Sequence, residues 1–401
     1  MTGTMDEEDQ MALSRRSFVR TVGLGSLSSA LIAARGREAL LAAGLSEAQI
    51  QASQAGRTAA TIKISSNENP RGPSPAALAA IRGRTSHEVG RYPDNINALT
   101  DLIAKINGAK PDNVWLGTGS GPELTAAARA FLSPSKHLVT GNPSYESPVR
   151  DATKIGATIR SLPLDRNLRL DLGAMAEASP GAGLIFVCNP NNPTSTVHPA
   201  ATIAAFVQRV KKATPDVAIL IDEAYIDYST DPPYPTSVPL ALEYPGVFVM
   251  RTFSKAYGMA GLRLGYAIGQ PQTLAALNDA WGMGSVNVLT AAAGIAALND
   301  KAHMDKERLE NKRVRDFTIN SFKEMGYEVA DSATNFVFVN IRRPAAEFRE
   351  ACAREGVLVG RDFPPLEKTH ARISIGTWEE MHTAVDVFRR VLGTTSRAVA
   401  R

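Results

Sequence analysis

The chain is poor in cysteine and almost balanced in charge. It has two cysteines in 401 residues, Cys188 and Cys352, and their separation fits neither a zinc site nor a redox pair. The formal net charge is +4, from 44 basic and 40 acidic residues, which is too even to indicate a nucleic-acid or anionic membrane partner. We therefore expect two separate buried thiols, no metal site, and a small molecule as the partner.

Long apolar runs are also lacking. The run "TVGLGSLSSALIAA" has 14 residues, too few to cross a bilayer as a lone helix. It follows "SRRSFVR", in which Arg15 and Arg16 resemble the pair of a twin-arginine export signal, an address read by a receptor and not an anchor. The alternative is the basic start of an alanine-rich helix. We expect a signal region at residues 1–45 and export to the periplasm or the extracellular space, with no membrane anchor in the mature form.

The rest of the chain alternates between two patterns. Short runs rich in branched or aromatic residues, such as "HLVTGN", "GLIFVCNP", "VAILIDEAY" and "VFVMRTFSK", are separated by helical patterns such as "PAATIAAFVQRVKKA". Strands that are apolar throughout and separated by helices predict an α/β fold. Its central sheet should be mostly parallel, with helices on both faces.

After Leu289 the pattern changes to a long charged helix, at about residues 301–325, and short strands such as "NFVFVNI" and "ARISIG". This change predicts a smaller C-terminal α/β domain. We expect four segments after the signal region: an N-terminal arm at 46–90, a large domain at 91–289, the small domain at 290–395 and a tail at 396–401.

Polar residues follow four of the predicted strands, where open α/β sheets bind their ligands. In "LGTGSGPEL" a strand ends and a helix begins, so the free backbone N–H groups of the turn can hold a phosphate. "CNPNNPTS" places two asparagines between prolines. "LIDEAYIDY" places Asp222 at the end of a very apolar strand, with Tyr225 three residues later, and "TFSK" ends another strand with Lys255.

Each motif alone has an ordinary interpretation. The glycine and Asn-Pro segments could be simple turns, and Lys255 could be a surface charge. "GTGSGP" departs from the dinucleotide fingerprint, which disfavours a nicotinamide-dependent oxidoreductase. Asp222 and Glu223 could be a metal-binding pair of a nucleotide hydrolase, but no Gly-Lys-Ser/Thr loop accompanies them. The order of the motifs along the chain is therefore more informative about function than any single motif.

The order "GTGSG", "NPSYE", "NPNNPT", "DEAY", "SKAYGMAGLRLGY" resembles the fold-type I pyridoxal-phosphate enzymes of the class I/II aminotransferase family. Within that family the sequence is most similar to the histidinol-phosphate aminotransferase branch, over roughly residues 64–391. The resemblance implies the transferase fold of aspartate aminotransferase and the cofactor pyridoxal 5′-phosphate. It also implies a ping-pong transamination between an amino acid or amine and a 2-oxo acid.

The resemblance assigns roles around the cofactor ring. Lys255 would form the imine with the cofactor's aldehyde and then act as the base that moves the proton. Asp222 would pair with the pyridine nitrogen, and Asn192 and Tyr225 would donate hydrogen bonds to the ring oxygen. Tyr145, in "PSYES", would stack on the ring; its alternative is a core aromatic.

The phosphate and the substrate are assigned in the same way. Backbone groups at Gly119, Ser120 and Gly121, the hydroxyl of Ser254 and the guanidinium of Arg263 would hold the phosphate, with Thr252 as a further contact. The resemblance also implies that Tyr92 reaches the phosphate of a neighbouring subunit, which predicts a homodimer with shared sites.

Arg372 would clamp the substrate's α-carboxylate, Arg361 would assist it, and Asn67 would lie near the mouth of the site. Both arginines could instead be surface residues. Many relatives have Asp-Glu where this chain has Gly121 and Pro122, and an exported enzyme is expected to act on an amine or amino acid outside histidine biosynthesis. Alternatives on the same scaffold are a decarboxylase, a cyclase or a protein that binds the cofactor without turnover.

Overall fold

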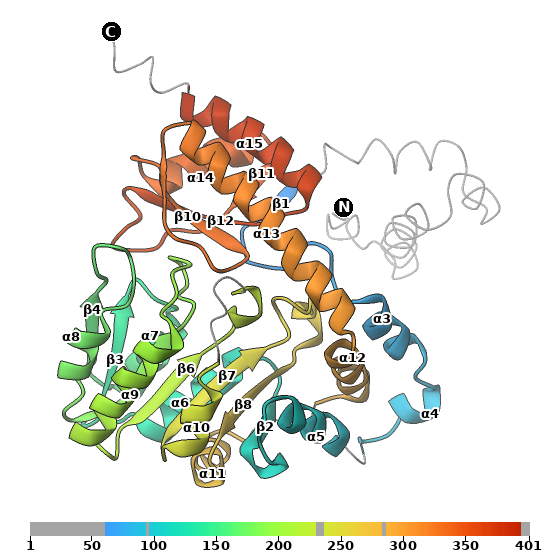
Figure 1. Ribbon diagram of the computed structural model, residues 1–401, viewed down its shortest axis with the longest axis vertical. Coiled ribbons are helices and arrows are strands. Elements are labelled where there is room, and N and C mark those ends of the chain that lie inside the picture. Colours follow the sequence, from blue (N-terminus) through green and yellow to red (C-terminus); the bar gives the residue numbers. More distant parts are fainter. Residues whose placement is uncertain (1–60, 94–95, 230–235, 283–285, 394–401) are drawn as a thin grey trace, which may run out of the picture. The chain divides into compact units, whose positions relative to one another are not determined.

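The computed structural model describes residues 61–93, 96–229, 236–282 and 286–393 (Figure 1). The predicted signal region at 1–45, the first fifteen residues of the predicted arm (46–60) and the predicted tail at 396–401 lie outside the described residues. The described chain is built on a large mixed sheet, a smaller antiparallel sheet and a two-stranded pair.

The large sheet has seven strands in the order β2-β8-β7-β6-β5-β3-β4. Its strands are β2 (Val114–Gly117), β3 (His137–Asn142), β4 (Ile159–Pro163), β5 (Ala182–Cys188), β6 (Ala218–Asp222), β7 (Val247–Thr252) and β8 (Gly265–Gly269). Six of its strands run in one direction, and β8 alone runs in the opposite direction. The predicted α/β fold with a mostly parallel central sheet is therefore confirmed.

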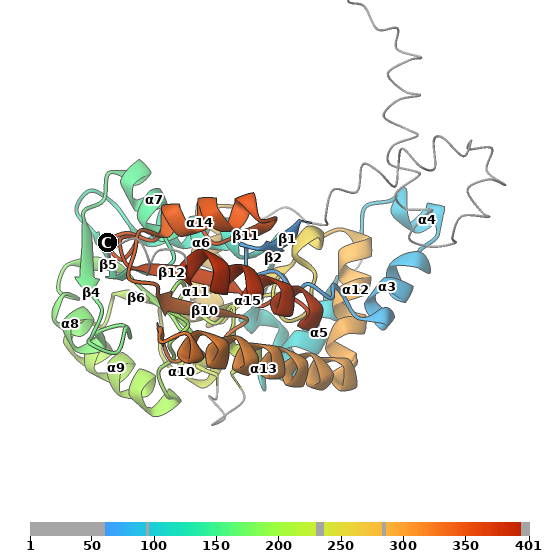
Figure 2. The same cartoon turned by 90° about the horizontal axis from the view of Figure 1, so that it is seen from above.

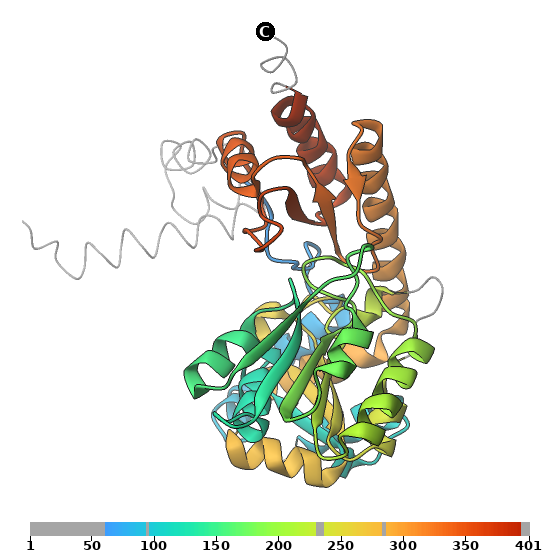
Figure 3. The ribbon, with the colours of Figure 1, turned by 90° about the vertical axis from the view of Figure 1, so that its left-hand side faces the viewer.

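Helices cover both faces of this sheet, which Figure 3 shows from the side. One face carries α6 (Ser120–Phe131), α7 (Ser147–Ile155) and α11 (Pro271–Ala280). The other carries α5 (Asn97–Ile106), α8 (Leu172–Glu177), α9 (Ala200–Ala213), α10 (Val238–Glu243) and α12 (Val288–Asn299). Successive side chains of a strand point to opposite faces, so Ile219 and Ile221 enter one core and Leu220 enters the other. This explains why these strands read as continuously apolar.

The C-terminal part forms the smaller α/β unit seen from above in Figure 2. Its antiparallel sheet has the order β12-β10-β9. The elements are α13 (Lys301–Glu324), β9 (Glu328–Val329), β10 (Phe336–Asn340), α14 (Ala345–Arg354), β11 (Val357–Val359), β12 (His370–Ser374) and α15 (Trp378–Gly393). Phe322, Phe348 and Phe388 lie fully buried where the three helices meet the sheet.

Shorter elements connect these units. They are β1 (Ile62–Ile64), α3 (Pro75–Arg82), α4 (Ser86–Val89) and the 3-10 turns η1 (Pro111–Asn113), η2 (Ile226–Tyr228) and η3 (Ala260–Leu262). β1 pairs in parallel with β11, so the N-terminal arm contributes a strand to the small unit.

The predicted boundary between residues 289 and 290 falls inside α12. Ala291, Ala293 and Ala297 of that helix pack in the core of the large sheet, and α12 also contacts α3 and α5. The small unit thus starts after α12, where the Asp300 side chain accepts a hydrogen bond from the His303 N–H and caps α13. Within the described ranges, no helix combines the length and the apolar character needed to cross a membrane.

Candidate active site

A cavity of about 630 Å³ opens at the carboxyl ends of β5, β6 and β7, between the large sheet and the small unit. This is the edge where parallel strands present their ligand-binding residues. The structure brings most of the predicted site residues into its lining: Asn67, Ser120, Gly121, Tyr145, Asn192, Asp222, Tyr225, Ser254, Lys255, Arg263, Arg361 and Arg372. Residues 305 positions apart in the chain, Asn67 and Arg372, meet in this one cavity.

Lys255 lies in the turn after β7 and is partly buried. Its Nζ donates to the carbonyl oxygen of Ser66 at 3.3 Å and lies 5.6 Å from the centre of the Tyr225 ring. Burial, followed by the positive charge of Arg372, lowers the pKa of Lys255 to about 8. Near neutral pH a fraction of this amine is therefore uncharged, as a nucleophile or a base requires.

Asp222 ends β6 and is almost fully buried, at 4% exposure. Its Oδ1 accepts a hydrogen bond from the Ala224 N–H at 3.1 Å. Burial raises the pKa of Asp222 to about 6, although the Ala224 hydrogen bond and the charge of Lys255 oppose that rise. The side chain is thus mostly ionised at neutral pH, at the floor of the cavity.

The turn from β2 into α6 forms a cradle for an anion. Gly119 adopts φ +93° at the helix N-cap, and no side chain caps the first N–H groups of α6. A Cβ at Gly119 would collide with the guanidinium of Arg263, which therefore lies directly against the turn. Ser254 borders the same space, where its Oγ accepts from Thr252 Oγ1 at 3.0 Å. Uncapped N–H groups, the helix dipole and one arginine together suit a phosphate.

Arg372 projects from β12 and is buried at 6% exposure. Its Nη1 donates to Asn192 Oδ1 at 2.7 Å, its Nη2 donates to the Ser65 carbonyl oxygen at 2.8 Å, and its buried Nε has no hydrogen-bond partner among the described residues. Burial lowers the pKa of Arg372 to about 10. A desolvated guanidinium with spare donor capacity is suited to a substrate carboxylate.

Tyr225 is held by a short chain of hydrogen bonds. Asn67 Nδ2 donates to Tyr225 Oη at 3.2 Å, and Ser374 Oγ donates to Asn67 Oδ1 at 2.7 Å. Asn67 is only 1% exposed, so it lies deeper than a residue at the cavity mouth. Burial raises the pKa of Tyr225 above its ordinary value. The phenol therefore keeps its proton and can donate a hydrogen bond into the cavity.

Arg361 lies at the rim. Its side chain is half exposed, its Nη2 lies 2.5 Å from Glu146 Oε2, and its guanidinium packs on the Phe363 ring. Tyr145, the neighbour of Glu146, lines the cavity. Its stacking on a cofactor ring stays a prediction.

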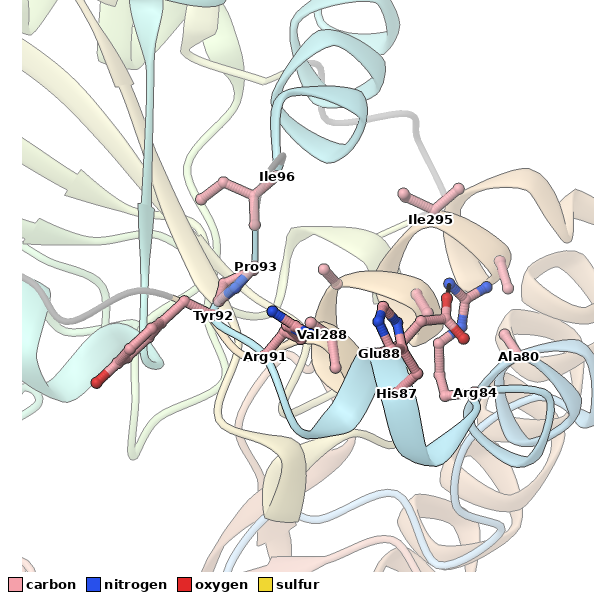
Figure 4. A pocket seen from close by; sticks show the side chains of 13 residues that line it. Ala80, Arg84, His87, Glu88, Arg91, Tyr92, Pro93, Ile96, Val288 and Ile295 are labelled. Carbon is pink, nitrogen blue, oxygen red and sulfur yellow. Dashed lines mark hydrogen bonds and ion pairs between the residues drawn. The ribbon is translucent and has the colours of Figure 1, made fainter.

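Three predicted residues lie outside this lining. Gly119 is the N-cap of α6, and Thr252 is buried beneath Ser254. Tyr92 is 94% exposed and borders a second cavity of about 470 Å³ beside α4 and α12, where its ring points away from Arg84 and Glu88 (Figure 4). The structure thus places Tyr92 apart from the site of its own chain.

Sequence reasoning missed several residues of this region. Cys188 and Ser66 line the cavity, and Glu123 lies buried beneath it in the first turn of α6. A signal for Glu123 was available, because it is a carboxylate next to Leu124, Ala126 and Ala127 in a buried helix.

Comparisons with known proteins agree with this geometry. The family model "Aminotransferase class I and II" matches residues 59–388. The histidinol-phosphate aminotransferase of Moorella thermoacetica is 37% identical over 336 residues, covering 82% of this chain and 85% of its own length. The one of Symbiobacterium thermophilum is 37% identical over 334 residues, covering 83% and 91%.

The solved structure of histidinol-phosphate aminotransferase from Sinorhizobium meliloti, in complex with pyridoxal-5′-phosphate, superposes with a TM-score of 0.76 at 27% identity, covering 85% of this chain and 93% of that one. The match to the family model alone extends over most of the chain. The protein therefore belongs to the aminotransferase class I and II family.

Proposed function

We propose that this aminotransferase moves an amino group between an amino acid or amine and a 2-oxo acid by a ping-pong mechanism, with pyridoxal 5′-phosphate bonded to Lys255. The observation that carries the proposal is that Lys255, the buried carboxylate of Asp222 and the buried guanidinium of Arg372 line one cavity, in which the pKa of the lysine is lowered. The relatives named above support the reaction type. We propose the substrate only as a class, because the family resemblance leads us to expect Asp-Glu where this chain has Gly121 and Pro122.

The residues present fit this cofactor. The uncapped N–H groups of Ser120 and Gly121, with the Arg263 guanidinium against Gly119, would hold the phosphate. Asp222 would lie opposite the pyridine nitrogen and keep it protonated. When bound, the cofactor supplies an aldehyde and an electron-accepting ring. The protein supplies position, charge and a proton acceptor.

Two residues would act directly on the substrate. Arg372 would bind the α-carboxylate of the substrate. Its hydrogen bonds to Asn192 and to the Ser65 carbonyl oxygen hold the guanidinium in position. Lys255 Nζ would take the proton from the substrate's α-carbon and return it to a different atom. The lowered pKa of Lys255 favours this proton transfer near neutral pH. Tyr225, kept protonated by burial, would donate a hydrogen bond to the cofactor.

A screen of amino donors against 2-oxo acids tests the function, with Lys255→Ala as the inactive control. We expect Lys255→Ala to fold and to lose transamination by more than about 10⁴-fold, because both the covalent attachment and the base are removed. The exposed Lys154→Ala is the matched control and should retain activity. Near-normal turnover in Lys255→Ala would reject the assignment. A donor that only loses carbon dioxide would indicate the decarboxylase alternative.

We further propose that the chain works as a homodimer in which Tyr92 reaches the phosphate of the partner subunit. Its exposure of 94% and its position outside the cavity of its own chain support this. Tyrosine is enriched at surfaces that another protein covers.

We also propose that the protein is exported by the twin-arginine route, on the strength of "SRRSFVR". Replacing Arg15 and Arg16 together by lysine should leave the protein in the cytoplasm, which cell fractionation with a cytoplasmic marker can measure. Unchanged export of that variant would contradict the proposal.

A further inference from the structure

Glu123 is a buried carboxyl group that the proposed mechanism does not use. It lies in the first turn of α6 with 0% of its surface exposed. Neither of its side-chain oxygens has a hydrogen-bond partner among the described residues. They lie close to β8, because a Cβ at Gly265 would be 2.9 Å from Oε1 and 3.1 Å from Oε2. Keeping a charge in such a place without a partner is very unfavourable.

The charged groups near Glu123 come from several elements. Asp222 ends β6, and Arg263 lies in the turn before β8. Asp151 of α7 is engaged elsewhere, because it accepts a hydrogen bond from Thr125 Oγ1 at 2.8 Å. Glu123 therefore has one anionic and one cationic neighbour, and the anionic one is the proposed partner of the cofactor's pyridine nitrogen.

The two carboxyl groups have unequal surroundings. Asp222 accepts a backbone hydrogen bond from Ala224 and faces the ammonium of Lys255, whereas Glu123 receives no hydrogen bond. Two nearby buried carboxyls do not both ionise easily, and the one with better partners keeps the charge. The pKa directions agree: burial and the charge of Asp222 raise the pKa of Glu123 well above its ordinary range, against the pull of Arg263.

We propose that Glu123 is a positioning residue that stays a neutral carboxylic acid and so leaves the single negative charge of the pair on Asp222. This inference rests on the proposed role of Asp222. A neutral Glu123 also adds no negative charge beneath the turn that would hold the phosphate. Glu123 thus influences the charge of the site although its side chain does not line the cavity.

Infrared difference spectra of the full-length protein test the proposal, recorded over a range of pH for the wild type, Glu123→Gln and Glu123→Leu. At pH 7 the wild type should show the C=O band of a protonated carboxyl that both variants lack. Glu123→Leu serves as the reference if Glu123→Gln does not fold. Glu307→Gln is the matched control, because Glu307 is equally buried but paired with Arg71, and its replacement should leave the band in place.

The coupling is tested with Asp222→Asn. Removing the neighbouring charge should make Glu123 release its proton at a pH lower by about one unit or more than in the wild type. Absence of the band at pH 7 would overturn the proposal. It would also be overturned if the band of Glu123 titrates identically in the wild type and in Asp222→Asn, or titrates in neither. The measurement does not depend on turnover, so an enzyme without transaminase activity could still show the band.

Discussion

At Lys255, burial and the neighbouring Arg372 act on the amine in the same direction, and both lower its pKa. In the proposed mechanism, only the uncharged amine of Lys255 would attack the cofactor's aldehyde. The rate at which cofactor-free protein captures pyridoxal phosphate should therefore rise with pH through about 8, the pKa of this amine. Stopped-flow absorbance over a pH series measures this rate.

Arg372→Met provides the control for that pH dependence. Removing the nearby positive charge leaves burial as the main cause of the shift, so the midpoint should move to higher pH. An unchanged midpoint would show that Arg372 does not act on Lys255.

Residues with a motif around them could be predicted from the sequence, and residues without one could not. The motifs gave Lys255, Asp222 and Arg372 as site candidates, and the structure brings them into one cavity. The sequence could not show that the Arg361 guanidinium pairs with Glu146, because that contact joins two segments with no mutual pattern. Glu123 was missed although the sequence carried a signal, a carboxylate among the apolar residues of a helix. Its neighbours Asp222 and Arg263 become visible only when the sheet is assembled.

At the scale of elements, the β2–α6 turn depends on a glycine. The backbone at Gly119, with φ +93° and ψ 159°, is almost restricted to glycine, and its missing side chain leaves room for Arg263. Gly119→Ala should therefore weaken pyridoxal phosphate binding by at least about tenfold, the cost of losing one charge-assisted hydrogen bond. Equilibrium dialysis measures this affinity.

Gly108→Ala is the matched control for that change. Gly108 also has a positive φ, at +64°, but nothing lies within 4 Å of the Cβ that the substitution would add. Both variants should lose about 1–3 kcal/mol of unfolding free energy to backbone strain. Only Gly119→Ala should lose cofactor affinity, and an equal loss in both would attribute the effect to strain alone.

Strong local patterns were the elements that sequence reasoning placed well. The predicted "HLVTGN" strand is β3, and the helix expected at about 301–325 is α13, Lys301–Glu324. β1 and β9 were not predicted, because three- and two-residue strands have too few positions to show alternation. The sequence also could not show which domain contains α12. Its alanine-rich surface fits the core of either domain, and only its packing against α3 and α5 assigns it to the large sheet.

At the scale of the whole molecule, the proposed sharing of sites gives a complementation test. In a hybrid of Lys255→Ala and Tyr92→Ala chains, one site would combine the intact Lys255 of one chain with the intact Tyr92 of the other. Its second site would carry both defects. Mixed and reassembled chains should therefore recover about a quarter of wild-type activity, although each variant alone is impaired.

Activity that equals the average of the two separate variants at every mixing ratio would contradict the shared site. Size-exclusion chromatography with light scattering provides the control, because it shows whether each variant still forms dimers before the chains are mixed.

The hydrogen bonds of Arg372 also bear on when the pocket can form. They join this residue to positions 180 and 307 residues earlier. During synthesis, Lys255 and Asp222 emerge from the ribosome well before the arginine that completes their surroundings. A chain terminated between residues 255 and 372 would therefore carry the amine of Lys255 without the arginine proposed to bind the substrate, so the complete pocket can form only after residue 372 has been made.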